Sequence, residues 1–298
     1  MSDTCVTLLN PVDEKRVLTL SKLATVAESQ GLNVLLLGAF ARDLLFWHMH
    51  NIECHRATMD VDIVVQLKDW TAYHKYRRAL VELGFKEDEA EDHPEKLTDP
   101  ETAVEVDLLP FGEIAKDGKT VVWPEDDSRW SVVGIQDAYD HALKLNIAEG
   151  GRRRAIRFIS IPSLVLLKIV ASQERPEARA KKDAVDIGFV VQKYLAVGNR
   201  ERLEGGPHGD IMATVGDDLD RATAQLLGRD IKAMISPATK NYIVPLLEHE
   251  AVSRSPCPFS QGLSRSLCRG DFNRARMIIR DILGGLNWRP AEGSGTPL

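Results

Sequence analysis

The first half of the chain alternates between apolar runs of strand length and amphipathic runs of helix length. Apolar residues recur at spacings of three and four within residues 14–29, 39–49 and 68–83, which predicts helices there. Short apolar or alternating runs predict strands at residues 33–38, 58–67, 102–110 and 119–123. Strands and helices that alternate in this way predict a β-sheet domain with helices packed on it.

From residue 161 onward the pattern becomes almost wholly helical. Helical periodicity predicts six segments, namely residues 161–175, 178–196, 210–227, 229–235, 239–250 and 269–283. The sequence GGPHG interrupts this series at residues 205–209, and the closing segment from Trp288 has the glycine and proline content of a tail. We therefore expect a sheet domain over residues 1–158, a helical domain over residues 159–286 and a disordered tail over residues 287–298.

The composition is that of a soluble globular protein. Of the 298 residues, 44% are hydrophobic and 28% are charged, and no apolar run approaches the roughly 18–20 residues that cross a bilayer. The four cysteines are scattered, which fits a reducing compartment and disfavours a disulfide framework or a four-cysteine zinc site. The N-terminal residues lack the pattern of a secretory signal. These features predict a cytoplasmic protein without membrane association.

The formal net charge of −6 conceals two blocks of opposite sign. Residues 86–107 carry a net charge of −8, and residues 144–182 carry a net charge of +7, with Arg152, Arg153, Arg154 and Arg157 at the centre of the basic block. A basic block within an acidic chain suits a polyanionic ligand such as an RNA backbone. The alternative is a solvated arm of a hairpin with no aromatic residues for base stacking.

Two aspartates at the beginning of an apolar strand are the first candidates for chemistry. In the segment TMDVDIVV, Asp60 and Asp62 are two residues apart and are therefore expected on one face of the strand. Adjacent carboxylates repel each other and favour a cation, and their hard oxygen atoms favour Mg²⁺. The alternative interpretation is a strand end that reaches solvent with two hydrated aspartates.

Two neighbouring segments favour the metal interpretation. The segment LGAFARD predicts a strand, a tight turn at Gly38 and a helix whose free N–H groups suit a phosphate, with Arg42 one helical turn further on. The segment VEVDLLPFG predicts a second strand that contains Asp107, with Glu105 on the same face. Three carboxylates on two strands beside a glycine turn are the arrangement that two-metal phosphoryl chemistry requires.

These three segments together resemble a known family. The combination resembles the nucleotidyltransferase superfamily that includes DNA polymerase β and the tRNA CCA-adding enzymes. It resembles more closely the AbiEii/AbiGii toxin-type nucleotidyltransferases of bacterial abortive-infection and toxin–antitoxin systems. The closer likeness spans roughly residues 33–190 and includes Trp70, Gly84-Phe85, Trp123-Pro124, the helix of Lys168 and the segment KDAVD at residues 182–186.

The resemblance implies a fold and a metal site. The fold would be α+β, a nucleotidyltransferase-type mixed β-sheet with flanking helices followed by a helical C-terminal domain. Asp60 and Asp62 would bind two Mg²⁺ ions, with Mn²⁺ as the alternative cofactor. Asp107 would bind one ion and activate the attacking hydroxyl.

The resemblance also implies a nucleotide site. Gly38, Ala39 and Arg42 would hold the triphosphate of an NTP. The superfamily usually has glycine or serine where this chain has Ala39, so one hydroxyl contact is lost while the backbone amides remain.

Lys168 is a further candidate because apolar residues surround it within one turn of its helix. Such a lysine either extends to solvent or meets an anion, and the resemblance favours a phosphate contact. Replacing it by alanine is expected to cost little stability. The family has an aspartate in the next helix, for which Asp183 is the candidate and Asp186 the reserve, while ion pairing with Arg179 within the helix is the alternative.

The sequence thus predicts a nucleotidyltransferase that moves a nucleoside monophosphate from an NTP onto a hydroxyl. The resemblance implies an RNA acceptor, with the 3′ end of tRNA as the best candidate, a toxin role and a neighbouring antitoxin protein. A small molecule such as an aminoglycoside, or a protein side chain, is the alternative acceptor. A catalytically silent nucleotide-binding module is the rival of another class.

Overall fold

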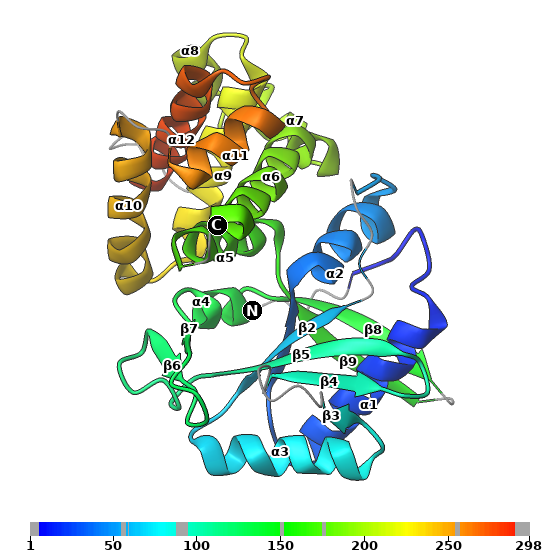
Figure 1. Cartoon of the computed structure of the whole chain (residues 1–298). Coiled ribbons are helices and arrows are strands. Elements are labelled where there is room, and N and C mark those ends of the chain that lie inside the picture. Colours follow the sequence, from blue (N-terminus) through cyan, green and yellow to red (C-terminus); the bar gives the residue numbers. More distant parts are fainter. Residues whose placement is uncertain are drawn as a thin grey trace. The chain divides into compact units, whose positions relative to one another are not determined.

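The computed structural model describes residues 6–54, 58, 60–87, 95–149, 152–174, 177–253 and 257–289. The chain divides into two compact units, Met1–Leu164 and Val165–Leu298, and each is described by itself (Figure 1). None of the described helices is both long enough and apolar enough to cross a membrane.

The first unit is built on a seven-stranded mixed sheet in the order β3-β4-β5-β2-β1-β9-β8 (Figure 1). Its strands are β1 (Val34–Leu37), β2 (Val61–Gln66), β3 (Lys86–Glu87), β4 (Lys96–Asp99), β5 (Val104–Phe111), β8 (Leu143–Glu149) and β9 (Arg152–Phe158). The pairs β2–β5 and β1–β9 are parallel and the other neighbours are antiparallel. A separate ribbon pairs β6 (Thr120–Val122) with β7 (Arg129–Ser131).

One face of this sheet is apolar and is covered by α1 (Glu14–Ser29) and α3 (Trp70–Glu82). The alternate residues Val61, Ile63 and Val65 of β2 are at most 1% exposed. The hydroxyl of Tyr73 in α3 donates to the Leu108 carbonyl of β5 at 3.2 Å. Side chains two apart on a strand share a face, so the other residues of β2, Asp62 among them, belong to the opposite face.

The segment after β1 differs from the single helix expected over residues 39–49. It forms α2 (Gly38–Asp43) and then a π-helical turn over Leu44–His48. The short helix α4 (Ile135–Asp140) lies near the C-terminal end of β5, where the ring centroids of Tyr139 and Phe111 are 6.0 Å apart.

The second unit is helical. Its elements are α5 (Ile161–Glu174, which begins in the first unit), α6 (Glu177–Lys193), a 3₁₀ turn (Tyr194–Val197), α7 (Arg200–Leu203), α8 (Asp210–Val215), α9 (Leu219–Met234), α10 (Pro237–Val252), α11 (Pro258–Ser266) and α12 (Phe272–Asn287). Helices α9 and α12 approach so closely that a Cβ atom on Gly228 would lie 2.2 Å from the Ile282 carbonyl oxygen. A mixed sheet followed by helices confirms the predicted α+β fold class.

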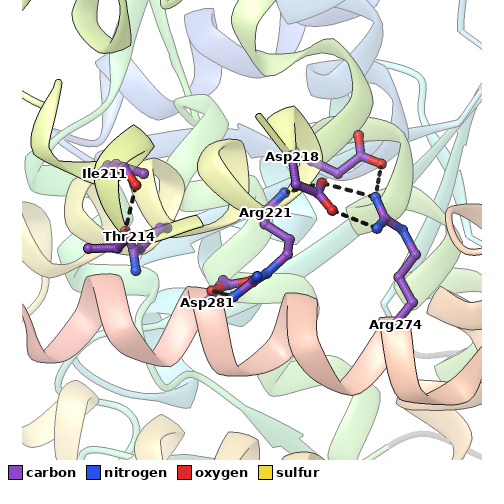
Figure 2. A network of polar contacts seen from close by, with 8 residues as sticks. Ile211, Thr214, Asp218, Arg221, Arg274 and Asp281 are labelled. Carbon is purple, nitrogen blue, oxygen red and sulfur yellow. Dashed lines mark hydrogen bonds and ion pairs between the residues drawn. The ribbon is translucent and has the colours of Figure 1, made fainter. Parts of the chain in front are cut away.

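Ion pairs join α9 to α12 around the start of α9. Figure 2 shows Arg221 of α9 paired with Asp281 of α12 at 2.7 Å, and Arg274 of α12 paired at 2.7 Å with Asp218, the N-cap of α9. The continuous helix predicted over residues 210–227 is therefore wrong, because α8 ends before Gly216 and α9 begins anew after the Asp218 cap.

The beginning of the predicted tail belongs to the helical unit. Asn287 is the last residue of α12, and the Arg229 guanidinium lies 4.1 Å from the centre of the Trp288 ring. Disorder was therefore a wrong prediction for these two positions. Residues 290–298 lie outside the described residues.

Candidate active site

Asp62 and Asp107 lie side by side in the sheet. Strands β2 and β5 are parallel neighbours, and their register places Asp62 directly opposite Asp107. Both side chains are half-buried, whereas Glu105, two residues earlier on β5, is exposed. The structure thus brings together two of the three predicted carboxylates and favours Asp107 over Glu105 as the partner of Asp62.

Gly38 closes one side of this pair. Strand β1 is antiparallel to β2 with Leu37 opposite Asp62, so the residue after the strand reaches the Asp62 carboxylate. Gly38 has a φ of +76°, and a Cβ atom there would lie 1.8 Å from Asp62 Oδ2. The turn predicted from the sequence is therefore in contact with the first carboxylate of the site.

Asp60 lies outside the strand on which it was expected. Strand β2 begins at Val61, and Asp60 is exposed immediately before it. Its backbone N–H donates to the Thr58 hydroxyl at 3.2 Å. Its charge nevertheless reaches the pair, because it contributes to the raised pKa of Asp107.

The electrostatic environment of Asp107 is that of a crowded carboxylate. Its pKa is raised to about 6, first by burial and then by the charge of Asp62, while the cation of Lys96 opposes the rise. Lys96 lies directly opposite Asp107 across the β4–β5 ladder. Lys96 was missed as a site residue because strand β4 lies in the acidic block, where charge obscured the strand pattern.

The donor chemistry of the pair suits a divalent cation. Carboxylate oxygens are the ligands that Mg²⁺ and Mn²⁺ accept, and a cation would relieve the repulsion that raises the Asp107 pKa. Across the described ranges, no three His, Cys, Asp or Glu side chains are gathered so that they could hold a metal ion. The structure therefore shows a carboxylate pair with a third, exposed carboxylate two residues away along the chain.

Arg42 does not occupy the position expected of a phosphate ligand. Its side chain is fully buried, with 0% exposed, and it pairs with Asp43 at 2.8 Å. The Cys54 thiol also lies in this cluster, where burial raises its pKa to about 12. The prediction that Arg42 holds a triphosphate is therefore not supported, because an enclosed guanidinium cannot reach it. Ala39, beside Gly38, stays half-buried at the start of α2.

Lys168 meets two carboxylates within the helical unit. Its Nζ lies 2.9 Å from Asp183 Oδ1 and 2.6 Å from Asp186 Oδ2, joining α5 to α6. Both aspartates are at most 2% exposed, while Arg179 is exposed. Lys168 therefore meets an anion and does not extend to solvent. The anion is a pair of aspartates instead of a phosphate, and the ion pairs join two helices instead of lying within one. These ion pairs reverse the expectation for alanine at position 168, because two buried carboxylates would lose their cation and we now expect a loss of stability.

The basic segment is divided between the two faces of the sheet. Arg154 donates to Glu28 and to Ser21 of α1, each at 3.2 Å, on the face that α1 covers. Arg157, three residues later on β9, belongs to the other face, and its guanidinium lies 4.9 Å from the centre of the Tyr139 ring. Only Arg157 of these two arginines therefore lies on the face of Asp62, and the choice between an RNA contact and a solvated arm stays open for it. The side chains of Arg152 and Arg153 lie outside what the structure describes.

Comparison with known proteins gives partial likenesses. No protein-family model matches the chain, and no curated protein matches it. The solution structure of the antibiotic-resistance factor ANT(2'')-Ia is similar at 15% identity and a TM-score of 0.35, over 55% of this chain and 76% of that one. ANT(2'')-Ia in complex with adenylyl-2''-tobramycin gives 15% identity and a TM-score of 0.34, over 54% of this chain and 78% of that one.

A CCA-adding enzyme in complex with ATP is also similar, at 16% identity and a TM-score of 0.25, over 94% of this chain and 68% of that one. Identities and TM-scores at this level assign neither a family nor an activity. The case for function therefore depends on the carboxylate pair and on the motifs that resemble nucleotidyltransferases.

Proposed function

We propose that this chain is a divalent-metal-dependent nucleotidyltransferase. It would move a nucleoside monophosphate from an NTP onto a hydroxyl group and release pyrophosphate. The observation that carries the proposal is the register of Asp62 opposite Asp107, with Gly38 in contact with Asp62. Two crowded carboxylates beside a glycine turn are costly in an apolar sheet, and a catalytic cation site gives a reason for them.

Each carboxylate has a role in the proposed reaction. Asp60, Asp62 and Asp107 would hold the divalent ions, which supply Lewis-acid stabilisation of the phosphate oxygens. Asp107, which lies directly opposite Asp62 in the β2–β5 pair, would also accept the proton of the acceptor hydroxyl. The hydroxyl oxygen then bonds to the α-phosphorus, the α–β phosphoanhydride bond breaks, and pyrophosphate leaves.

The remaining predicted residues have different support. The backbone N–H groups of Gly38 and Ala39 begin α2, where helix N–H groups have no intrahelical partner and suit a phosphate. Lys168 and Asp183 are retained as catalytic candidates by the motif resemblance alone, since their observed partners are each other and Asp186. Arg42 is left out because it is enclosed.

For the acceptor we propose RNA, with the 3′ end of tRNA first, and for the biological role a toxin with a cognate antitoxin. Arg157 of the basic block, which lies on the face of Asp62, and the AbiEii/AbiGii-like motifs support this choice. A small molecule or a protein side chain as acceptor, and a module that binds nucleotide without transfer, are outcomes of the test below.

The test is a transfer assay with α-labelled NTPs. The protein is incubated with Mg²⁺ or Mn²⁺, each NTP in turn, and either total RNA, an aminoglycoside mixture or protein acceptors. We expect labelled RNA with the parent protein. The label should be lost when EDTA is added, and it should be absent with the Asp62→Asn and Asp60→Asn variants. Glu105→Gln is the matched control, because Glu105 is an exposed carboxylate on the same strand face as Asp107. Full transfer by Asp62→Asn, or no label in any acceptor, would overturn the proposal.

A further inference from the structure

The face of the sheet that carries the two aspartates also carries a cationic pair. Val64, two residues after Asp62, lies opposite Leu35 of β1, and Leu35 lies opposite Arg157 of β9. Arg157 in turn lies opposite Lys144 of β8. Residues paired across strands point to the same face, so Arg157 and Lys144 share the face of Asp62.

The sheet spacing sets the separation between the two charged ends of this face. Arg157 is two strands across from β2, at the level of Val64, two residues along the strand from Asp62. With about 4.8 Å between strands and about 3.3 Å per residue, the backbone positions of Asp62 and Arg157 are about 12 Å apart. This separation is within the length of a nucleotide or a short stretch of RNA backbone. Leu35 and Val64, between the two positions, are fully buried, so such a substrate would lie over the residues that cover them.

Arg157 is held in place by an aromatic ring. Its guanidinium stacks over Tyr139 of α4, which itself packs near Phe111 at the end of β5. Cation–π stacking leaves the N–H groups at the edge of the guanidinium able to donate. Within the part of the chain that the structure describes, no carboxylate forms an ion pair with Arg157. Lys144, directly opposite Arg157 on β8, adds a second basic residue to this face.

We infer that Arg157, positioned by Tyr139, binds a phosphate group of a substrate that extends along this face from the Asp62–Asp107 pair. The inference rests on the proposed function for the identity of the substrate. The phosphate belongs either to the polyphosphate of the NTP or to the backbone of an RNA acceptor. Both sources share the chemistry of a phosphate dianion or diester accepting charge-assisted hydrogen bonds.

The same strand supplies a matched control. Arg154 is the same residue type, three positions earlier on β9, and it is bound on the opposite face to exposed Glu28 and to Ser21. Replacing Arg154 by glutamine removes one positive charge from the same strand but none from the aspartate face. Any effect specific to Arg157→Gln is therefore an effect of the face and not of net charge.

The experiment measures binding to three probes, namely Mg²⁺–ATP, inorganic tripolyphosphate and a single-stranded RNA oligonucleotide. We expect Arg157→Gln to weaken at least one probe about 10- to 100-fold, the scale of a charge-assisted hydrogen bond, and Arg154→Gln to change each less than about twofold. Tyr139→Phe keeps the stacked ring and should bind as the parent does, whereas Tyr139→Ala should fall between the parent and Arg157→Gln.

The pattern across probes identifies the phosphate. If Arg157→Gln loses affinity for ATP and tripolyphosphate, the contact is with the NTP. If it loses affinity for RNA, and the dependence of log affinity on log salt becomes less steep, the contact is with the acceptor. Equal affinities of Arg157→Gln and Arg154→Gln for all three probes, or a parent that binds none of them, would overturn the inference. If Arg157→Gln specifically loses binding while the parent protein transfers no nucleotide, the proposed reaction is refuted and this phosphate contact still stands.

Discussion

Oδ2 of Asp62 occupies the space in which a side chain at position 38 would begin. A Cβ atom on Gly38 would lie 1.8 Å from that oxygen, far inside the contact distance of the two atoms. Leu37, the residue before Gly38, is paired with Asp62 in the β1–β2 ladder. The turn after β1 and the first carboxylate of the site are therefore fixed by one contact, and neither can change without the other.

Gly38→Ala should consequently disturb both stability and site geometry. We expect about 1 kcal/mol from the positive φ and about 1–3 kcal/mol from the displaced carboxylate, measured as the free energy of unfolding in urea. Metal and nucleotide affinity should fall with it. Gly31→Ala is the control, because Gly31 has a φ of +66° but nothing within 4 Å of a Cβ atom. Equal effects of the two variants would show that Asp62 moves aside at no cost.

Much of the sheet could be predicted because its central strands are apolar on both faces or nearly so. Strands β1, β2 and β5 are largely apolar in this way, and the bounds predicted for all three agree with the observed bounds to within a few residues. Strand β9 was hidden by its arginines, which alternate between the two faces and resemble a charged loop. Strand β8 alternates Leu143, Leu145 and Ile147 with polar residues, a pattern typical of a strand, although no strand was predicted there.

The site was predictable in its residue types and not in its contacts. Asp62 and Asp107 carry the signal of polar residues in apolar strands, but their register depends on a parallel pairing that forms across the intervening helix α3. The pairing of Lys168 with Asp183 and Asp186 depends on how α5 meets α6. Such relations between distant segments leave no mark in local periodicity.

Asp107 should give the protein a pH dependence of stability. Its pKa is about 6 in the folded protein and 3.8 as the reference for the unfolded chain, so the folded state keeps a proton that the unfolded state has lost between these values. Stability therefore falls as pH rises from about 4 to about 6 and then levels. Asp107→Asn removes this penalty and should stabilise the protein by about 2 kcal/mol at pH 7.5 and by little at pH 4.

The measurement is urea unfolding of parent and Asp107→Asn at pH 4, 5, 6 and 7.5. Mg²⁺ or Mn²⁺ added at pH 7.5 should raise the melting temperature of the parent and leave that of Asp107→Asn nearly unchanged, because metal binding to the native state stabilises it. A stability difference between the two proteins that is constant over this pH range would contradict the raised pKa.

Lys168→Ala should destabilise the protein strongly. Asp183 and Asp186 are 2% and 1% exposed, so removing the lysine leaves two buried charges without their cation. We expect a loss of about 3–5 kcal/mol at neutral pH, measured by urea unfolding. The triple variant Lys168→Ala with Asp183→Asn and Asp186→Asn should regain most of the loss. Transfer activity recovered with stability would show that Lys168 and Asp183 are structural, and activity that stays lost would support a catalytic role for one or both of them.

The two arginines that join α9 to α12 should differ in their contribution to stability. Arg221 pairs with Asp281, whose side chain is 7% exposed, whereas Arg274 pairs with Asp218 and Asp220, whose side chains are 26% and 33% exposed (Figure 2). Burial raises the pKa of Asp281 and Arg221 opposes that rise. Removing Arg221 therefore leaves a carboxylate that water cannot solvate, while the partners of Arg274 stay hydrated.

We expect Arg221→Met to cost about 2–4 kcal/mol of unfolding free energy at pH 7 and Arg274→Met about 1 kcal/mol. The cost of Arg221→Met should shrink as pH falls toward 4, because a protonated Asp281 needs no cation, and the added variant Asp281→Asn should remove most of it at pH 7. The measurement is urea unfolding of the four proteins at both pH values. If Arg221→Met and Arg274→Met lose equal stability at both, burial of Asp281 does not govern the strength of this pair.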